Sequence, residues 1–175
     1  MMVDDRQQSM TMTTTNGQPD ASLDPALDGV FDDHCHRYPL RVHYEDTDAG
    51  GIIYHAQYLA FAERARSAWL RCLGIDQPAM LVAENRGFVV RRIEIDFLLP
   101  SGLGAVLEVE SSLLRLGGAS LTVQQNIINR GNGHILARLL VEIGLVDFKN
   151  ASPPKICRLP AAIKTKFSGL VSSAR

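Results

Sequence analysis

The sequence predicts an α+β protein in which one long helix packs on one face of a mostly antiparallel sheet of five strands. A run with helical periodicity covers residues 56–73, and four runs of alternating polarity follow between residues 88 and 148. Breaks that contain glycine or proline separate these four runs, as is typical of hairpin connections. A segment with helical periodicity that is followed by four segments with strand periodicity predicts this architecture.

The helix has a continuous apolar stripe. Its spacing follows the i, i+3, i+4, i+7 rule, with Tyr58, Phe61, Ala62, Ala65, Ala68, Trp69 and Cys72 on one side. The opposite side carries Glu63, Arg64 and Arg66, and we expect these residues to face solvent. Gly74 lies just past the end, where a C-terminal glycine commonly stops a helix.

The strands are expected at 37–45, 88–99, 105–115, 121–130 and 134–148, with a short closing helix near 160–167. In the first strand, Val42 and Tyr44 are expected on the same side. In the second, alternation places Val89 on the apolar face with Ile93, Ile95, Phe97 and Leu99. Ser111 and Gln125 also fall at apolar-face positions of their strands. Charged residues on the other face predict that only one face of the sheet is buried.

Length and composition fit one globular domain. We divide the chain into a flexible leader at 1–36, a domain at 37–168 and a tail at 169–175. A formal net charge of -1 gives no electrostatic case for binding nucleic acid. Neither a transmembrane segment nor a secretory signal is recognisable, and three widely spaced cysteines suggest no disulfide framework, so we expect a cytoplasmic protein.

One short segment carries the residue types of a metal site. It reads Asp32-Asp33-His34-Cys35-His36. Ligands packed so closely in one segment rarely all face one ion without partners elsewhere in the chain. We therefore expect no metal.

The most informative stretch is the acidic loop at 44–55, directly before the long helix. It holds Asp46 and Asp48, followed by two glycines. Amides at a helix start favour negative charge, so a carboxylate beside them can serve the hydrolysis of an activated carbonyl. A simple turn, in which the aspartates accept hydrogen bonds from local amides, explains the same residues. For Asp46, capping or turn formation is the simpler role, and for Asp48 both interpretations stay open.

The same stretch resembles a known family. Val42 to Tyr58 reads VHYEDTDAGGIIYHAQY, and Glu63-Arg64-Ala65-Arg66 follows it. This pattern resembles the signature of hotdog-fold acyl-CoA thioesterases, in particular the group associated with the bacterial Tol-Pal envelope system and related to 4-hydroxybenzoyl-CoA thioesterase. The likeness extends over about residues 38–167 and leaves the leader without a counterpart.

The resemblance implies a long helix wrapped by a curved sheet, and a homodimer whose sheets join edge to edge, often paired again into tetramers. It implies an acyl-CoA substrate and no bound cofactor, since coenzyme A is part of the substrate. Carried over by position, Asp48 is the catalytic carboxylate, acting as general base or nucleophile. The backbone N–H of His55 is the donor that polarises the thioester carbonyl.

Five further residues are expected to contact substrate. Gly50, Gly51, Ile52 and Tyr54 belong to the loop itself, and Arg91 is a candidate for holding a coenzyme A phosphate. A different class of function uses the same fold: a non-hydrolytic protein that binds acyl thioesters or acts as a scaffold near the envelope machinery. A retained Asp48 favours the enzyme, because a binder has no evident need for a carboxylate beside an electron-rich thioester.

Overall fold

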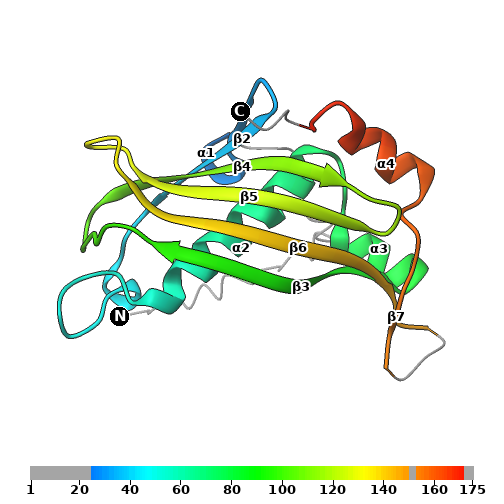
Figure 1. Cartoon of the computed structure of the whole chain (residues 1–175), viewed down its shortest axis with the longest axis horizontal. Helices are drawn as coiled ribbons and strands as arrows, with labels where there is room; N and C mark the ends of the chain where they lie inside the picture. The colour runs from blue at the N-terminus through cyan, green and yellow to red at the C-terminus, as the bar shows by residue number, and fades with distance from the viewer. Residues whose placement is uncertain (1–24, 150–152, 172–175) are drawn as a thin grey trace, which may run out of the picture.

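The computed structural model describes residues 25–149 and 153–171. Figure 1 shows one curved sheet crossed by a long helix. The strands are β1 (Val30–Asp32), β2 (Cys35–Arg41), β3 (Arg86–Phe97), β4 (Val106–Leu116), β5 (Ser120–Asn129), β6 (Ile135–Asp147) and β7 (Lys155–Ile156). The helices are α1 (Pro25–Asp28), the 3₁₀ turn η1 (Tyr44–Asp46), α2 (His55–Cys72), α3 (Gln77–Glu84) and α4 (Ala161–Ser168).

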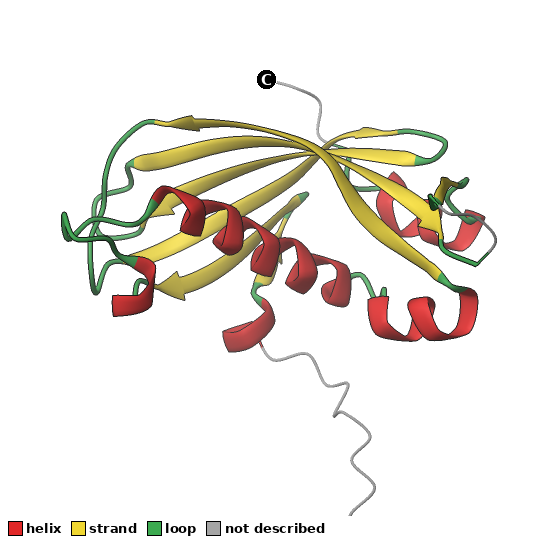
Figure 2. Ribbon diagram, turned by 90° about the horizontal axis from the view of Figure 1, so that it is seen from below, coloured by secondary structure: helices red, strands yellow, loops and turns green. Residues whose placement is uncertain are grey.

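All strand pairs are antiparallel, in the order β1-β2-β4-β5-β6-β3, and β7 pairs with the end of β6. The five predicted strands are present, and the two short strands β1 and β7 raise the total in the described chain to seven. Helix α3 was not predicted. Seen from below in Figure 2, α2 lies against one face of the sheet. The α+β prediction is confirmed.

The core lies between α2 and the sheet. The predicted stripe of α2 is buried from Tyr58 to Trp69, and only Cys72 keeps partial exposure. Its alanines let the helix lie close to inward-facing Leu107, Val109 and Val123, none of which is exposed. The prediction for Arg66 is wrong, because this residue is only 5% exposed and turns toward the sheet.

A β-bulge changes the alternation along β3. Register shifts between Val90 and Arg92, so Arg91 is an extra residue in the strand. Before the bulge, Phe88 and Val90 pair with Leu145 and Ile143 of the apolar face. The sequence prediction placed Val89 on that face, and this is wrong because one extra residue inverts the alternation.

The chain leaves β2 earlier than predicted. The strand ends at Arg41, and a 3₁₀ turn follows in place of the last predicted strand residues. The carboxylate of Asp46 accepts a hydrogen bond from the His43 N–H at 2.8 Å, and this closes the turn. Tyr44 is therefore exposed, whereas Val42 remains buried.

The predicted leader also extends too far into the domain. Residues 1–24 lie outside the described residues, but α1, β1 and the start of β2 occupy 25–36. This N-terminal arm (residues 25–36) packs on the end of α2. Asp28 pairs with Arg71 at 2.6 Å, and its carbonyl accepts a hydrogen bond from buried His36 at 2.7 Å. Long-range contacts of this kind have no local sequence pattern.

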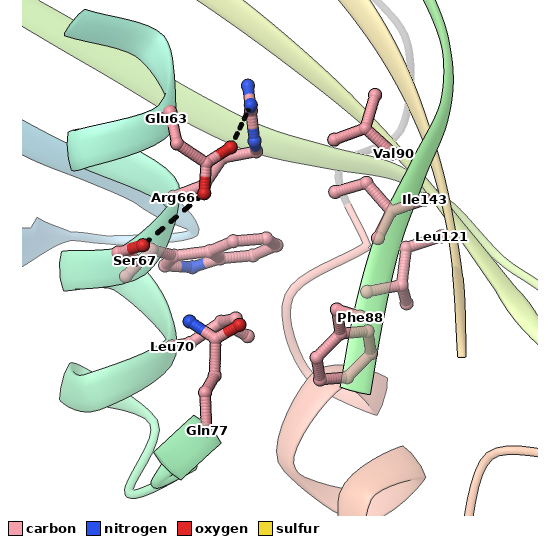
Figure 3. A pocket seen from close by; sticks show the side chains of 10 residues that line it. Glu63, Arg66, Ser67, Leu70, Gln77, Phe88, Val90, Leu121 and Ile143 are labelled. Carbon is pink, nitrogen blue, oxygen red and sulfur yellow. Dashed lines mark hydrogen bonds and ion pairs between the residues drawn. The ribbon is translucent and has the colours of Figure 1, made fainter. Parts of the chain in front are cut away.

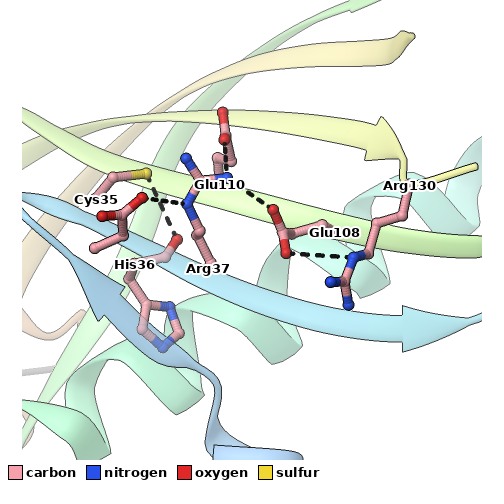
Figure 4. A network of polar contacts seen from close by, with 7 residues as sticks. Cys35, His36, Arg37, Glu108, Glu110 and Arg130 are labelled. Carbon is pink, nitrogen blue, oxygen red and sulfur yellow. Dashed lines mark hydrogen bonds and ion pairs between the residues drawn. The ribbon is translucent and has the colours of Figure 1, made fainter. Parts of the chain in front are cut away.

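The outer face of the sheet is tied together by charge. Figure 4 shows Arg37 of β2 between acidic side chains of β4. Its guanidinium lies 2.9 Å from Glu108 and 2.6 Å from Glu110, and Arg130 approaches Glu108 at 3.7 Å. These pairs link neighbouring strands on the face opposite α2, as the charged residues predicted.

The C-terminal part closes one end of the core. Helix α4 confirms the predicted closing helix, and its Phe167 is fully buried against Trp69. Lys166 donates hydrogen bonds to the carbonyls of Leu73 and Gly74, at the end of α2. Among the described residues, no helix is long and apolar enough to cross a membrane.

Candidate active site

The acidic loop forms a small hairpin that leads into α2. Thr47 bridges Ile53, and the N–H of Asp48 donates to the carbonyl of Ile52 at 3.0 Å. At the tip, the N–H of Gly51 donates to the carbonyl of Asp48 at 2.9 Å, and Gly51 has a positive φ of 73°. Because the hairpin closes at Ile53, its base lies two residues before the start of α2.

Asp48 is exposed on this hairpin, with an Oδ1 atom that accepts a hydrogen bond from the Gly50 N–H at 2.8 Å. This contact is the turn role proposed as one alternative. Asn129 makes the same contact with Gly131 at 2.8 Å, so an amide oxygen supports such a turn equally well. The turn contact uses Oδ1, and the catalytic role of Asp48 stays a prediction.

Asp46 is set deeper than Asp48. It is 1% exposed, and Oδ2 accepts from His43 while Oδ1 has no hydrogen-bond partner within the described chain. Its carbonyl accepts from the Tyr54 N–H at 2.8 Å, which fixes the residue before α2. The turn-forming role expected for Asp46 is confirmed.

The start of α2 is exposed to solvent at Tyr54 and His55. Tyr54 is the N-cap residue and makes no side-chain capping hydrogen bond. First-turn N–H groups carry the positive end of the helix dipole and bind anions or developing negative charge. His55 is the first residue of the helix and is exposed, with its ring 4.4 Å from Tyr54 and 6.4 Å from Phe97 by ring centroids.

Apolar side chains surround this helix start without being buried. Ile52 is 44% exposed, Tyr54 45% and Phe97 52%. Leu98, Leu99 and Leu103 continue the exposed apolar surface beside them. Several exposed apolar side chains in one region favour binding or association there. The structure thus brings together Asp48, Gly50, Gly51, Ile52, Tyr54 and His55, as their closeness in sequence predicted.

Arg91 is placed elsewhere in the same chain. It is the bulged residue of β3, six residues before Phe97, which is about 20 Å along an extended strand. Its side chain is 75% exposed and lies 4.0 Å from Glu142. Arg91 therefore does not join the loop residues within one chain.

A cavity opens farther along α2, between this helix and β3. Figure 3 shows its two sides, with Phe88 and Val90 facing the helix. Its apolar lining is Trp69, Leu70, Phe88, Val90, Leu121 and Ile143. Its polar lining is Glu63, Arg66, Ser67 and Gln77. The cavity is partly open to solvent, and its volume within one chain is about 40 Å³.

Beneath this cavity lies a buried polar cluster, which we define as Arg66, Gln125 and Ser111. Arg66 donates to Gln125 at 2.6 Å and pairs with Glu63. Gln125 donates to Ser111 and to the carbonyl of Ala62, both at 3.0 Å. Sequence reasoning missed the cluster. A signal was present, however, since Ser111 and Gln125 were both predicted to face inward, and they are directly paired across β4 and β5.

The segment from Asp32 to His36 does not assemble into a ligand set. His36 is buried and stacks edge-on against Phe31, whereas His34 is paired with Asp33 on the surface. Burial lowers the pKa of His36, so its ring is neutral at pH 7. No group of three His, Cys, Asp or Glu side chains suited to a metal ion occurs in residues 25–149 and 153–171.

A helix crossed by a curved antiparallel sheet, with an acidic hairpin at the helix start, defines a hotdog-fold protein. Residues 50–135 match the model of the thioesterase superfamily. The acyl-CoA thioester hydrolase YbgC of Escherichia coli O6:H1 is 46% identical over 131 residues, which cover 75% of this chain and 94% of that protein.

Solved structures agree with this result. A probable thioesterase from Bartonella henselae superposes with a TM-score of 0.61 at 36% identity, covering 72% of this chain and 98% of that one. A 4-hydroxybenzoyl-CoA thioesterase superposes with a TM-score of 0.71 at 13% identity, covering 76% and 98%, and supports the fold alone. The chain belongs to the thioesterase superfamily, whose members are thioester hydrolases, and the resemblance stated from the sequence is confirmed.

Proposed function

We propose that this protein hydrolyses the thioester of an acyl-CoA to a free acid and coenzyme A, at the hairpin that precedes α2. The observation that carries the proposal is the position of Asp48, on a hairpin whose base adjoins the uncapped start of that helix. The relative from E. coli, with 46% identity, is named an acyl-CoA thioester hydrolase, which supports the same substrate class.

The chemistry needs an oriented nucleophile and stabilisation of an oxyanion. A water molecule attacks the carbonyl carbon while Asp48 accepts its proton, or Asp48 attacks directly and water then cleaves the resulting anhydride. First-turn N–H groups of α2, that of His55 among them, donate to the carbonyl oxygen as negative charge develops there. The C–S bond then breaks, and the coenzyme A thiolate leaves and takes up a proton. No further cofactor is needed, because a thiolate departs readily.

We also propose that the active site is completed by a second copy of the chain. Strand β3 is a sheet edge twelve residues long, and Val89, Val90 and Phe97 on it are exposed. Such an edge favours pairing with another strand, and a homodimer joined there would remove it. Two such dimers can pair into a tetramer, as the resemblance implies.

The dimer would bring separate features of the two chains together. Helix α2 runs antiparallel to β3, since Tyr58 lies against Phe97, whereas Trp69 and Leu70 share the cavity with Phe88. Antiparallel pairing of two β3 edges therefore lays the start of the partner's α2 beside the later half of this chain's α2. The partner subunit's Asp48 then faces the cavity, and Arg91, at the joined edge, is positioned to bind a coenzyme A phosphate.

The test is release of free thiol from a panel of acyl-CoA substrates by wild type and Asp48→Asn. Asparagine supports the same turn at position 129, so the hairpin is expected to survive while kcat/KM falls at least about 100-fold. Asp147→Asn is the matched control, because Asp147 makes the same turn contact with the Lys149 N–H, and it should change kcat/KM less than about twofold.

Three results would count against these proposals. Full activity in Asp48→Asn would remove Asp48 from the chemistry while leaving the hydrolase in place. No hydrolysis of any acyl-CoA by wild type would favour the alternative, a non-hydrolytic acyl-thioester binding or scaffold protein linked to the envelope. A monomer at micromolar concentration by light scattering would contradict the shared site.

Residence in the cytoplasm and association with the Tol-Pal system stay predictions, checked by fractionation and co-purification.

A further inference from the structure

Helix α3 is mostly apolar and yet largely exposed. It reads QPAMLVAE from Gln77 to Glu84, and of its residues only Met80 is buried. Val82 is 84% exposed and Leu81 49%. A helix that is apolar all round is normally covered by other parts of a protein. The exposed side of α3 has no such cover within the described residues, which indicates a surface for association.

A second exposed apolar surface lies at the other end of the same sheet edge. We define it as the hairpin surface, and it comprises Ile52, Tyr54, Phe97, Leu98 and Leu99. It lies where β3 ends, whereas α3 directly precedes the start of β3. Figure 1 shows α3 and the loop before α2 at opposite ends of this strand. Exposed apolar side chains therefore occur at both ends of the β3 edge.

Two-fold symmetry brings these two surfaces together. Antiparallel pairing of two β3 edges places the start of each strand beside the end of the other. Helix α3 of one copy then lies beside the hairpin surface of the second copy, and the reciprocal contact forms at the other end of the joined edge. Each apolar surface covers the other, so both are removed from water in the same dimer.

The cavity beside α2 supports the same arrangement. Gln77, the first residue of α3, lines this cavity, and Figure 3 shows it reaching toward the cavity from the start of the helix. The proposed dimer directs the partner subunit's Asp48 toward the same cavity. Helix α3 therefore borders the place where the partner's hairpin has to be held.

We infer that α3 acts on the second copy of the chain: its exposed side, with Val82, packs on that copy's hairpin surface and fixes the position of the partner's Asp48. Val82 is thus a positioning residue, since it acts through the hairpin. Burial of this side of α3 meets no unpaired charge, because the only charged residue of the helix, Glu84, is paired with Arg86 at 3.2 Å. The inference rests on the proposed function and its shared site.

Val82→Asp tests the contact, and Leu27→Asp is the matched control. Leu27 is also an exposed apolar residue on a helix, but it lies in the N-terminal arm, at the opposite edge of the sheet. By sedimentation, Val82→Asp should raise the dissociation constant of the dimer at least about 100-fold, because each dimer contains the contact twice. Leu27→Asp should change it less than about twofold. Equal constants for both variants, or a monomeric wild type, overturn the inference.

Mixed dimers test whether α3 serves its own hairpin or that of the second copy. At concentrations where it stays dimeric, Val82→Asp should lower kcat by about 10- to 100-fold, because the hairpin is misplaced. In a dimer of one Val82→Asp chain and one Asp48→Asn chain, the remaining Asp48 meets an unaltered α3 from the other chain, so one site is complete. Mixing the two variants should therefore restore about a quarter to a half of wild-type thiol release. No gain on mixing overturns the inference.

The outcomes separate this inference from the proposed function. If wild type hydrolyses no acyl-CoA but Val82→Asp alone weakens the dimer, the contact between α3 and the second copy stands and the hydrolase proposal fails. If wild type is an active hydrolase but mixing restores nothing, the proposed function stands and α3 does not position the partner's hairpin. Thermal melting confirms that each variant is folded.

Discussion

The acidic hairpin before α2 and the buried polar cluster beneath the cavity organise polar groups in opposite ways. In the hairpin, Asp48 bonds to Gly50 two residues away and keeps its side chain in solvent. In the cluster, Arg66 and Gln125 are 59 residues apart in sequence and both are buried. One region is held by local backbone contacts, and the other holds distant elements together.

This difference predicts that the hairpin and the cluster affect different properties of the protein. An exposed carboxylate on a self-contained hairpin can be changed at little cost to folding, so its loss is expected to appear in turnover. A buried guanidinium depends on its acceptors, and removing one leaves a charge without compensation. Substitutions in the hairpin should therefore alter activity, whereas substitutions in the cluster should alter the free energy of unfolding.

The largest effect is expected in the cluster. Gln125→Leu removes the acceptor of Arg66 and the donor to Ser111, and should lower the free energy of unfolding by about 3–5 kcal/mol. Gln124→Leu is the control, because Gln124 is the neighbouring glutamine on the other face of β5, and it should cost less than about 1 kcal/mol. Urea denaturation followed by Trp fluorescence measures both. Similar values for the two variants would show that the cluster does not stabilise the fold.

A glycine in the hairpin offers the next test. Gly51→Ala forces a side chain into a positive φ and should cost about 1–2 kcal/mol of stability. Gly104→Ala is matched, because Gly104 has a φ of 79° and an added Cβ would meet open space there, as at Gly51. Equal losses in melting temperature are expected, with a marked loss of thiol release only for Gly51→Ala. Equal activities would break the proposed link between hairpin shape and catalysis.

Acid should weaken the packing of the N-terminal arm through buried His36. His36 is buried with a lowered pKa, so the unfolded chain binds its proton more readily than the folded chain. The contribution of neutral His36 to the free energy of unfolding is complete above the pKa of the unfolded state, which is about 6.5. It is lost as pH falls toward the lower pKa of the folded state, at no more than about 1.4 kcal/mol per pH unit. Melting temperatures from pH 7.5 to 5 measure this, with exposed His134→Gln as the control. His36→Gln should flatten the profile, and an unchanged profile would contradict the assignment.

The smallest effect is expected at Asp46. Asp46→Asn keeps an oxygen for the His43 N–H, and should change stability by less than about 1 kcal/mol and activity by less than about threefold. Asp48→Asn, two residues on, is expected to abolish most turnover. If both variants lose activity alike, the two carboxylates act as a pair, and the contrast between a turn residue and a catalytic residue disappears.

Local patterns in the sequence predicted much of this molecule. The long helix, the four later strands and the closing helix follow from periodicity, because the core lies on one side of each element. The turn at Asp48 was also among the predictions, since Asp48 and Gly51 interact with residues two or three positions away. Features held by short-range contacts leave their pattern in neighbouring residues.

The remaining features depend on distant partners. The helical periodicity places Arg66 on the solvent-facing side of α2. Its buried partner, Gln125, lies on a strand far along the chain, so neighbouring residues do not reveal the contact. The N-terminal arm lacks periodicity, which predicted a flexible leader, and its anchors, Arg71 and Cys72, come more than forty residues later. Gly29 belongs to this arm, and a Cβ there would lie 2.2 Å from the Arg37 carbonyl oxygen. Single positions of this kind carry no periodic signal.

The extra residue in β3 has a consequence for comparing this chain with its relatives. Before Arg91, the side chains that face inward are at even-numbered positions, such as Phe88 and Val90. After Arg91, they are at odd-numbered positions, such as Ile93 and Ile95. A relative with a strand of the same length but without the insertion would turn the counterparts of Phe88 and Val90 outward. Its cavity beside α2 would then have a different lining, even where the aligned amino acids are identical.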